Sequence, residues 1–514
     1  MILLGIGVSI ALVAFVGFYV ARKVGGDSTN FLVAGRMLPL PLVGAALMGQ
    51  AVDTNATLGN TDLASEFGFW AGASLPLGLA LCLVLTGIFF AKPMNRMGLT
   101  TFPDYFRLRF GRPVEISSSI LLITAFCILV AGNLVAGGYL FNYFAGIPYW
   151  VGVVAIAVIV VAYTGAGGMI ADAYTAIIQM TLILVGSVAT LIWVTVAYGL
   201  TIPQGMNPFD FGQLTDPAQG ATINWATLIA LGIGDIVAID FMQRIFAARN
   251  PETARRACFV GAAGAAAIGI PFALIALAST AILPEEIDGP VLFVLLDQYA
   301  PVLLTIIVLC GIVGASMSTA NGAILATASV AVRNIGQVRR VHVEGEPDPL
   351  LRATRRMMIP MTLASIGFAI YVKQTGILLT LAFDLLLACL VVPFVLGLVW
   401  RRGTGLAAMA AIVVGLVVRL VLFVMTPTMF GVDNTILYIE NGLIGPAFDG
   451  WPTFIAFGAS LVAYLVVALV TPPAHLRGLD IQVADDIDDV LERTASAIEH
   501  GEPVMAGEPE PKPV

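Results

Sequence analysis

The chain has 514 residues, of which 59% are hydrophobic and only 11% are charged, and its mean hydropathy is +0.94. This composition is too apolar for a soluble fold of this length, so we expect an integral membrane protein. The formal net charge of -8 owes much to an acidic C-terminal segment.

Thirteen apolar runs follow one another along the chain, each close to the length of about 20 residues that crosses roughly 30 Å of hydrocarbon. They lie at 2–22, 38–64, 69–91, 115–140, 148–168, 173–198, 223–246, 257–282, 301–333, 356–373, 376–400, 404–427 and 451–471. The runs are continuous and do not alternate as the strands of an outer-membrane barrel do. The sequence therefore predicts an all-α membrane fold of about 13 transmembrane helices.

The first run predicts the orientation of the chain. No basic residue precedes it and no small-residue cleavage site follows it, so we do not expect a cleaved signal peptide. Arg22 and Lys23 come directly after it, and basic residues mark the cytoplasmic side. We therefore predict a multi-pass protein of the cell (inner) membrane, with the N-terminus outside and the C-terminus in the cytoplasm.

The composition divides the chain into two parts. Residues 1–473 form the predicted transmembrane domain, and residues 474–514 form an acidic tail that is rich in Pro and Glu and is expected to be partly disordered. Residues 483–499 could form a short amphipathic helix, although the composition favours a solvated tail. All three histidines fall in a cytoplasmic loop or in the tail, and no HExxH motif is present, so we do not expect an enzyme.

The stretch "GQAVDTNATLGN", residues 49–60, interrupts the second run with polar side chains. Such a segment is tolerated at membrane depth only where it is buried in protein or lines a water-filled cavity. An aspartate at the bilayer centre costs about 2.5 to 3.5 kcal/mol, so Asp53 is a functional candidate. The alternative is that Asp53 only caps a helix near the surface.

A second interruption lies in the seventh run, at "GIGDIVAIDFMQR", residues 232–244. Many transporters consist of two inverted repeats, each with a broken helix, and bind their cargo where the breaks meet. Here runs 2 to 6 (about 38–198) and 7 to 11 (about 223–400) would be the repeats. Each has five spans, an odd number, so the second repeat starts on the opposite side of the membrane.

The ninth run carries a group of oxygen atoms. Ala315, Ser318 and Thr319 are spaced i, i+3 and i+4, so one helix face presents a carbonyl and two hydroxyls. Neutral oxygen ligands suit a hard cation. Taken alone the pattern is weak, because Ser and Thr in membrane helices more often bond to their own backbone or to a neighbouring helix.

Four stretches together resemble the sodium:solute symporter family, whose members share the LeuT-type inverted-repeat fold. They are "NFLVAGRMLPL", "GLTTFPDYFRLRFG", "FMQRIFAARNPETARRA" and "ASMSTANGAILATASV". The resemblance implies a 5+5 inverted repeat with discontinuous helices 2 and 7, and a bound sodium ion. Its predicted ligands are the carbonyls of Ala51, Thr54 and Ala315 and the hydroxyls of Ser318 and Thr319.

The resemblance also suggests residues for the solute and for coupling. Asp53 matches an acidic position that is important for sodium coupling in proline-transporting relatives, and Asn55 matches a substrate-facing position of sugar-type relatives. The full set of candidates is Asp53, Asn55, Thr57, Asp235, Asp240, Phe241 and Gln243. Asp235 and Asp240 could instead face water in a vestibule or pair with Arg244.

The chain departs from the family at the second sodium site. Members with that site have an aspartate in "TDVIQ", where this chain reads "TAIIQ" with Ala176. Asn321 and Gly322 replace the hydroxyls expected further along helix nine. We therefore predict that the second site is absent and that one sodium accompanies each substrate.

The predicted solute follows from the charges near the breaks. Asp53, Asp62, Asp235 and Asp240 lie there and no basic residue is obvious, which favours a zwitterionic or cationic nitrogenous solute such as an amino acid, for example proline. A proton-coupled carrier using the intramembrane aspartates, or a sodium symporter of a neutral or carboxylate solute, stays open. The expected partners are this solute, sodium and the lipid bilayer, with no nucleic acid and no required oligomer. Arg419, in the twelfth run, is predicted to reach the interface from an outer helix, with a pairing role as the alternative.

Overall fold

The computed structural model describes residues 1–284, 286–338, 348–373, 375–400 and 402–472. These residues are mostly helical, with one antiparallel pair of short strands, Thr428–Met429 (β1) and Val432–Asp433 (β2). The predicted tail, 474–514, and the alternative helix within it lie outside the described residues.

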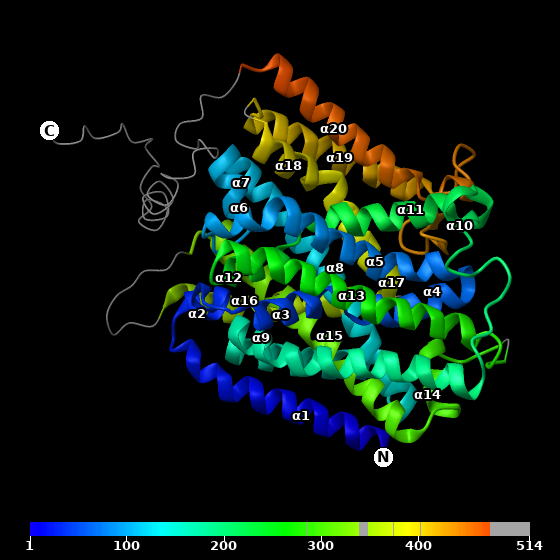
Figure 1. Cartoon of the computed structure of the whole chain (residues 1–514). Coiled ribbons are helices and arrows are strands. Elements are labelled where there is room, and N and C mark those ends of the chain that lie inside the picture. Colours follow the sequence, from blue (N-terminus) through cyan, green and yellow to red (C-terminus); the bar gives the residue numbers. More distant parts are fainter. Residues whose placement is uncertain (285, 339–347, 374, 401, 473–514) are drawn as a thin grey trace.

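The helices follow the whole described chain and pack side by side (Figure 1). They are α1 Ile2–Ala21, α2 Ser28–Val33, α3 Leu40–Ala51, α4 Asn60–Phe67, α5 Phe69–Leu85, α6 Ala91–Arg96, α7 Pro103–Phe110, α8 Arg112–Ala145, α9 Tyr149–Ala197, α10 Gly212–Thr215, α11 Ala221–Ile229, α12 Ile239–Ala247, α13 Pro251–Ser279, α14 Val291–Gln298, α15 Val302–Val330, α16 Pro349–Tyr371, α17 Thr375–Leu386, α18 Val392–Val399, α19 Gly405–Met425 and α20 Trp451–Val470.

Nine helical segments of the described chain are long and apolar enough to cross a membrane, or up to ten if α11 and α12 form one bent span. The protein is therefore a multi-pass membrane protein, as the composition predicts. The count of 13 stays a prediction, because α3 and α4 are each shorter than a full span and α9 runs over 49 residues.

The first helix and the last two lie at the edge of the bundle. Only 17% of the most apolar window of the first segment is buried, and 28% in both α19 and α20, compared with 78% in α8. In Figure 1, α1 and α20 lie along opposite sides, with α3, α13 and α15 between them. Helices at the edge present apolar side chains to lipid, whereas the central ones can carry polar groups.

A glycine interrupts the long helix α9. Gly168 has φ 52° and ψ -142°, outside the helical region, and a β-carbon there would clash with the carbonyl oxygen of Phe31. Tyr163 and Thr175 join their hydroxyls across the interruption. They are 12 residues apart, which is about 18 Å along a straight helix. The chain must therefore bend at Gly168, the last residue of the predicted run 148–168 and just before the run 173–198.

Gly168→Ala is expected to destabilise the protein by about 1–3 kcal/mol, because only glycine readily adopts this backbone conformation. The melting temperature of the purified chain in detergent measures the effect. Gly165→Ala is the matched control, since its β-carbon on the same helix meets no atom within 4 Å. Equal melting temperatures for the two variants would contradict the assignment of the bend to Gly168.

Backbone hydrogen bonds join the start of α3 to the end of α12. The amide of Leu38 donates to the carbonyl of Ala247 at 3.0 Å, and the amide of Arg249 donates to the carbonyl of Leu38 at 3.1 Å. The side chain of Asn95, on α6, donates to the carbonyls of Ile245 and Ala248. The start of α3, the end of α12 and α6 are thus joined.

The structure corrects the prediction for Arg419. Its side chain does not reach the membrane interface: it is 5% exposed and pairs with Asp384 on α17. A charged group is tolerated in the interior when it has a partner of opposite charge. This pair connects α19, near the edge of the bundle, to the central helices.

Candidate functional site

The first interruption lies wholly in the protein interior. Helix α3 ends at Ala51, Val52 leaves the helical conformation with φ -110° and ψ 88°, and a π-helical turn over 55–59 leads into α4. Every residue from 49 to 60 is buried. The polar side chains predicted to point away from lipid therefore do so.

Asp53 organises this break. One carboxylate oxygen accepts a hydrogen bond from the amide of Ala56 at 2.8 Å, and the other accepts from the side chains of Asn133, at 2.8 Å, and Asn55. The Thr57 hydroxyl donates to the Asp53 carbonyl at 2.9 Å. Asp53 does cap a half-helix, but at 1% exposure it lies far from the surface where the alternative placed it.

Asn133 connects the break to α8. Its side-chain oxygen accepts a hydrogen bond from the Thr54 hydroxyl at 3.0 Å, and its backbone carbonyl accepts one from the Ser316 hydroxyl of α15 at 3.0 Å. Sequence reasoning missed Asn133. The available signal was a single amide side chain inside the apolar run 115–140, which is costly in lipid unless it has partners.

The predicted sodium residues of α15 lie against the end of α3. The hydroxyl of Thr319 donates to the carbonyl of Gly49 at 2.7 Å and approaches that of Ala315 at 3.3 Å. The side-chain amide of Gln50 donates to the carbonyl of Ser318 at 2.9 Å. The structure thus brings Ala315, Ser318 and Thr319 to the segment that ends in Ala51. Thr54, beyond the break, is joined to Asn133.

The second interruption separates α11 from α12, which are bent by 47°. Ala238 is extended between them, and Asp240, in the first turn of α12, accepts a hydrogen bond from the amide of Phe241 at 2.7 Å. Asp235, Asp240, Phe241 and Gln243 are all buried. Neither aspartate faces open solvent.

Asp235 differs from the other buried aspartates in its hydrogen bonding. Both of its carboxylate oxygens lack a hydrogen-bond partner among the described residues. The thiol of Cys82 on α5, a weak donor, interacts with this carboxylate, and the carboxylates of Asp240 and Asp53 are close enough to repel it. A buried carboxylate without a strong donor is costly, so Asp235 is suited to take up a proton or a positively charged group.

The structure contradicts the prediction that no basic residue lies near the breaks. Arg244 is on α12, fully buried, and its Nη2 lies 2.5 Å from a carboxylate oxygen of Asp172 on α9. Its Nη1 donates to the carbonyl of Asp240 at 3.0 Å. Arg244 is the last residue of the interrupted stretch 232–244 and lies on the helix that follows the break.

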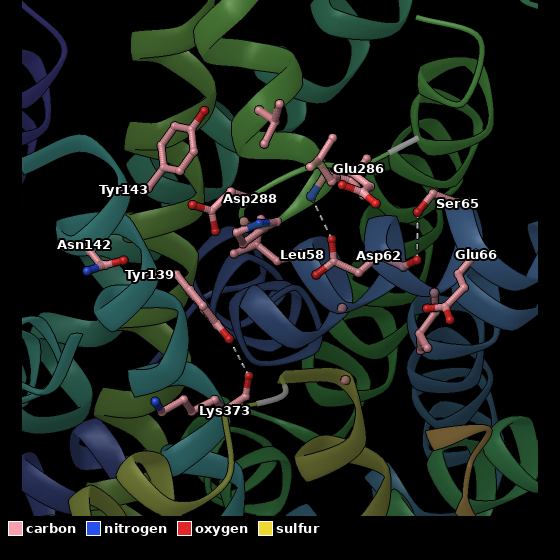
Figure 2. Close-up of a pocket in the computed structure, with 18 of the residues that line it drawn as sticks. Leu58, Asp62, Ser65, Glu66, Tyr139, Asn142, Tyr143, Glu286, Asp288 and Lys373 are labelled. Carbon is pink, nitrogen blue, oxygen red and sulfur yellow. Dashed lines mark hydrogen bonds between the residues drawn. The ribbon is translucent and has the colours of Figure 1, made fainter. Parts of the chain in front are cut away.

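A polar cavity of about 870 Å³ adjoins the first break (Figure 2). Its lining includes Leu58 and Gly59 from the π-helical turn. The charged side chains around it are Asp62, Glu66, Glu286, Asp288 and Lys373. Figure 2 shows Asp62 accepting a hydrogen bond from the Val291 amide and Tyr139 donating to the Lys373 carbonyl. Four carboxylates and one ammonium group make the cavity attractive to cations.

The comparison with family models decides the assignment. The model described as "Sodium:solute symporter family" matches residues 31–415, well over half of the chain. The chain belongs to the sodium:solute symporter family. The family predicted from the four stretches is thereby confirmed.

Several curated members of the family are similar to this symporter-family chain. The human sodium/iodide cotransporter is 27% identical over 67% of this chain and 55% of its own length. The human high affinity choline transporter 1 is 26% identical over 61% of this chain and 56% of its own length. The sodium/glucose cotransporter of Vibrio parahaemolyticus is 22% identical over 87% of this chain and 89% of its own length. The chain thus spans about half the length of the human relatives.

Solved structures match this symporter-family chain in fold. A Na⁺-coupled sialic acid symporter in a substrate-bound outward-open state has a TM-score of 0.72 at 17% identity, and covers 92% of this chain and 98% of its own. Mhp1, a nucleobase-cation-symport-1 family transporter in a closed conformation, has a TM-score of 0.51 at 12% identity. The match covers 90% of this chain and 99% of Mhp1. At these identities the likeness establishes the transporter fold alone.

Proposed function

We propose that the chain is a sodium-coupled secondary active symporter that imports a small organic solute by alternating access, with one sodium per solute. The observation that carries the proposal is the contact between α3, where it is interrupted, and the oxygen-bearing face of α15. Unpaired carbonyls at a helix end and hydroxyls of a neighbouring helix are suitable ligands for a monovalent hard cation. The proposed ligands are Ala51, Thr54, Ala315, Ser318 and Thr319.

The proposal includes the finer architecture. About 13 spans would form a LeuT-type 5+5 inverted repeat, about 38–198 and 223–400, with the N-terminus outside. The interruptions after Ala51 and at Ala238, and the bend at Gly168 within α9, support this arrangement. Each break falls where the repeat organisation expects a discontinuous helix or a helix boundary.

The charges of the site support a solute with a positively charged nitrogen. Asp53 and Asp235 lie at the two breaks, and Arg244 is already neutralised by Asp172. An ammonium group placed beside Asp235 would satisfy its two free oxygens. We therefore favour a zwitterionic or cationic nitrogenous solute, amino-acid-like as proline is. The relative named as a choline transporter fits this class, whereas those named for iodide and glucose fit the alternatives of an anionic or neutral solute.

A second candidate is a proton-coupled carrier of the same fold. The observation that favours it is again Asp235, because a proton would satisfy its carboxylate as well as an ammonium group would. The two candidates differ in the ion that drives uptake.

The energetics set a limit to sodium-coupled accumulation. One positive charge moved across about 100 mV provides about 2.3 kcal/mol, and a tenfold sodium gradient adds about 1.4 kcal/mol. With one sodium per solute, a solute of zero net charge is concentrated by roughly several hundred-fold at most.

Thermal-shift screening of the purified chain, followed by uptake in proteoliposomes, tests the proposal. We expect proline or choline to raise the melting temperature in sodium but not in potassium, and lactate and glucose to have no effect. Uptake of the stabilising solute should then require a sodium gradient. Stabilisation and uptake that are equal in potassium would contradict sodium coupling, and uptake driven in potassium by a pH gradient would favour the proton-coupled carrier.

A further inference from the structure

The ion pair of Arg244 and Asp172 lies among oxygen atoms that come from three elements. Asp172 belongs to α9, Ser318 and Asn321 to α15, and Gln50 to α3. The Ser318 hydroxyl donates to a carboxylate oxygen of Asp172 at 3.3 Å, and the Asn321 amide donates to the same oxygen at 3.1 Å. The other oxygen of Asp172 faces Arg244.

Two further oxygens in this group have no hydrogen-bond partner among the described residues. They are the side-chain amide oxygens of Gln50 and Asn321, and both are buried. With the carboxylate of Asp172 beside them, these oxygens make up a set of ligands that suits a small hard cation. Such a set would be costly to bury without any positive charge.

The guanidinium group of Arg244 supplies that positive charge, and the backbone of α15 at Gly322 leaves space for it. A β-carbon on Gly322 would clash with both Arg244 Nη2 and the Gln50 side-chain oxygen. Glycine at this position of α15 therefore gives Arg244 access to Asp172. The pair has no net charge, so the neighbouring oxygens lack the attraction that would recruit a free ion.

We propose that Arg244 is a fixed internal cation that occupies the place of a second sodium ion beside Asp172. This inference rests on the proposed function and explains its ratio of one sodium per solute. Removing the guanidinium leaves Asp172 charged and buried among neutral oxygen ligands, and a sodium ion is then the available neutralising group.

The experiment measures how many radiolabelled sodium ions the purified full-length chain binds at saturation. We expect one sodium for the wild type, two for Arg244→Gln, and one for the double variant Arg244→Gln with Asp172→Asn, which removes both charges. Arg244→Lys keeps the positive charge and is the matched control, with one sodium expected.

The outcomes separate this inference from the proposed function. A wild type that binds no sodium overturns the proposed function. A wild type that binds two, or a folded Arg244→Gln chain that binds one like the wild type, overturns only the fixed-cation inference. If Arg244→Gln is too unstable for binding measurements, its melting temperature decides: a larger rise on adding sodium than in the wild type supports the inference, and an equal rise overturns it.

Discussion

Replacing Ser318 and Thr319 together by alanine should raise the sodium concentration for half-maximal uptake by about 30-fold, while the chain stays folded in the membrane. Each hydroxyl removed from an ion costs about 1 kcal/mol in the simplest estimate, and 2 kcal/mol corresponds to about 30-fold in affinity. The change should fall on the sodium requirement, with maximal uptake at saturating sodium changing less. Uptake measured over a series of sodium concentrations checks this.

Thr327→Ala is the matched control for this double variant. Thr327 is on the same helix and equally buried, but its hydroxyl donates only to the carbonyls of Ala323 and Ile324 of its own helix. We expect the wild-type sodium dependence for it. A double variant with the same sodium dependence as Thr327→Ala would show that the sodium site lies elsewhere.

Asp53→Asn should reduce uptake at least tenfold. In the wild type the side-chain amides of Asn55 and Asn133 both donate to one carboxylate oxygen of Asp53. In the variant an NH₂ group, which is also a donor, takes the place of that oxygen. If Asn133 turns its amide over to compensate, the Thr54 hydroxyl loses its acceptor instead. Hydrogen bonds to a charged group contribute about 1.5–3 kcal/mol, which is tenfold or more in an equilibrium constant.

The control for Asp53→Asn is Asp216→Asn. Asp216 also caps a helical turn, by accepting from the amide of Ala218 at 2.9 Å, but it is exposed to solvent. Uptake and melting temperature should both stay close to the wild-type values. If Asp53→Asn transports as well as Asp216→Asn does, Asp53 has only a local structural role and the proposed coupling function is wrong.

The sequence was sufficient for the features that depend on local composition. Apolar runs predicted the helical membrane fold, and polar residues within two of those runs predicted the interruptions. The i, i+3, i+4 spacing placed Ala315, Ser318 and Thr319 on one face of α15. These features were predictable because helix periodicity determines which side chains share a face.

The features that could not be predicted depend on which helices are neighbours. Arg244 and Asp172 are 72 positions apart and meet only because α12 and α9 both pack against α15 and α3. Arg419 and Asp384 likewise pair between two helices. From the sequence the interface was favoured for Arg419, and a pairing role was the alternative without a named partner. Periodicity shows the face on which a charge lies, but not the partner that packing brings to it.

Backbone hydrogen bonds join Leu38 to Ala247 and Arg249, and the side chain of Asn95 donates to the carbonyls of Ile245 and Ala248. Together these bonds constrain how the molecule can move. With these bonds intact, α6 and the adjacent ends of α3 and α12 cannot swing separately. A pathway that opens at that end therefore requires a rigid-body tilt of the three segments together. The interruptions after α3 and before α12 are the positions where the hinges of this movement can lie.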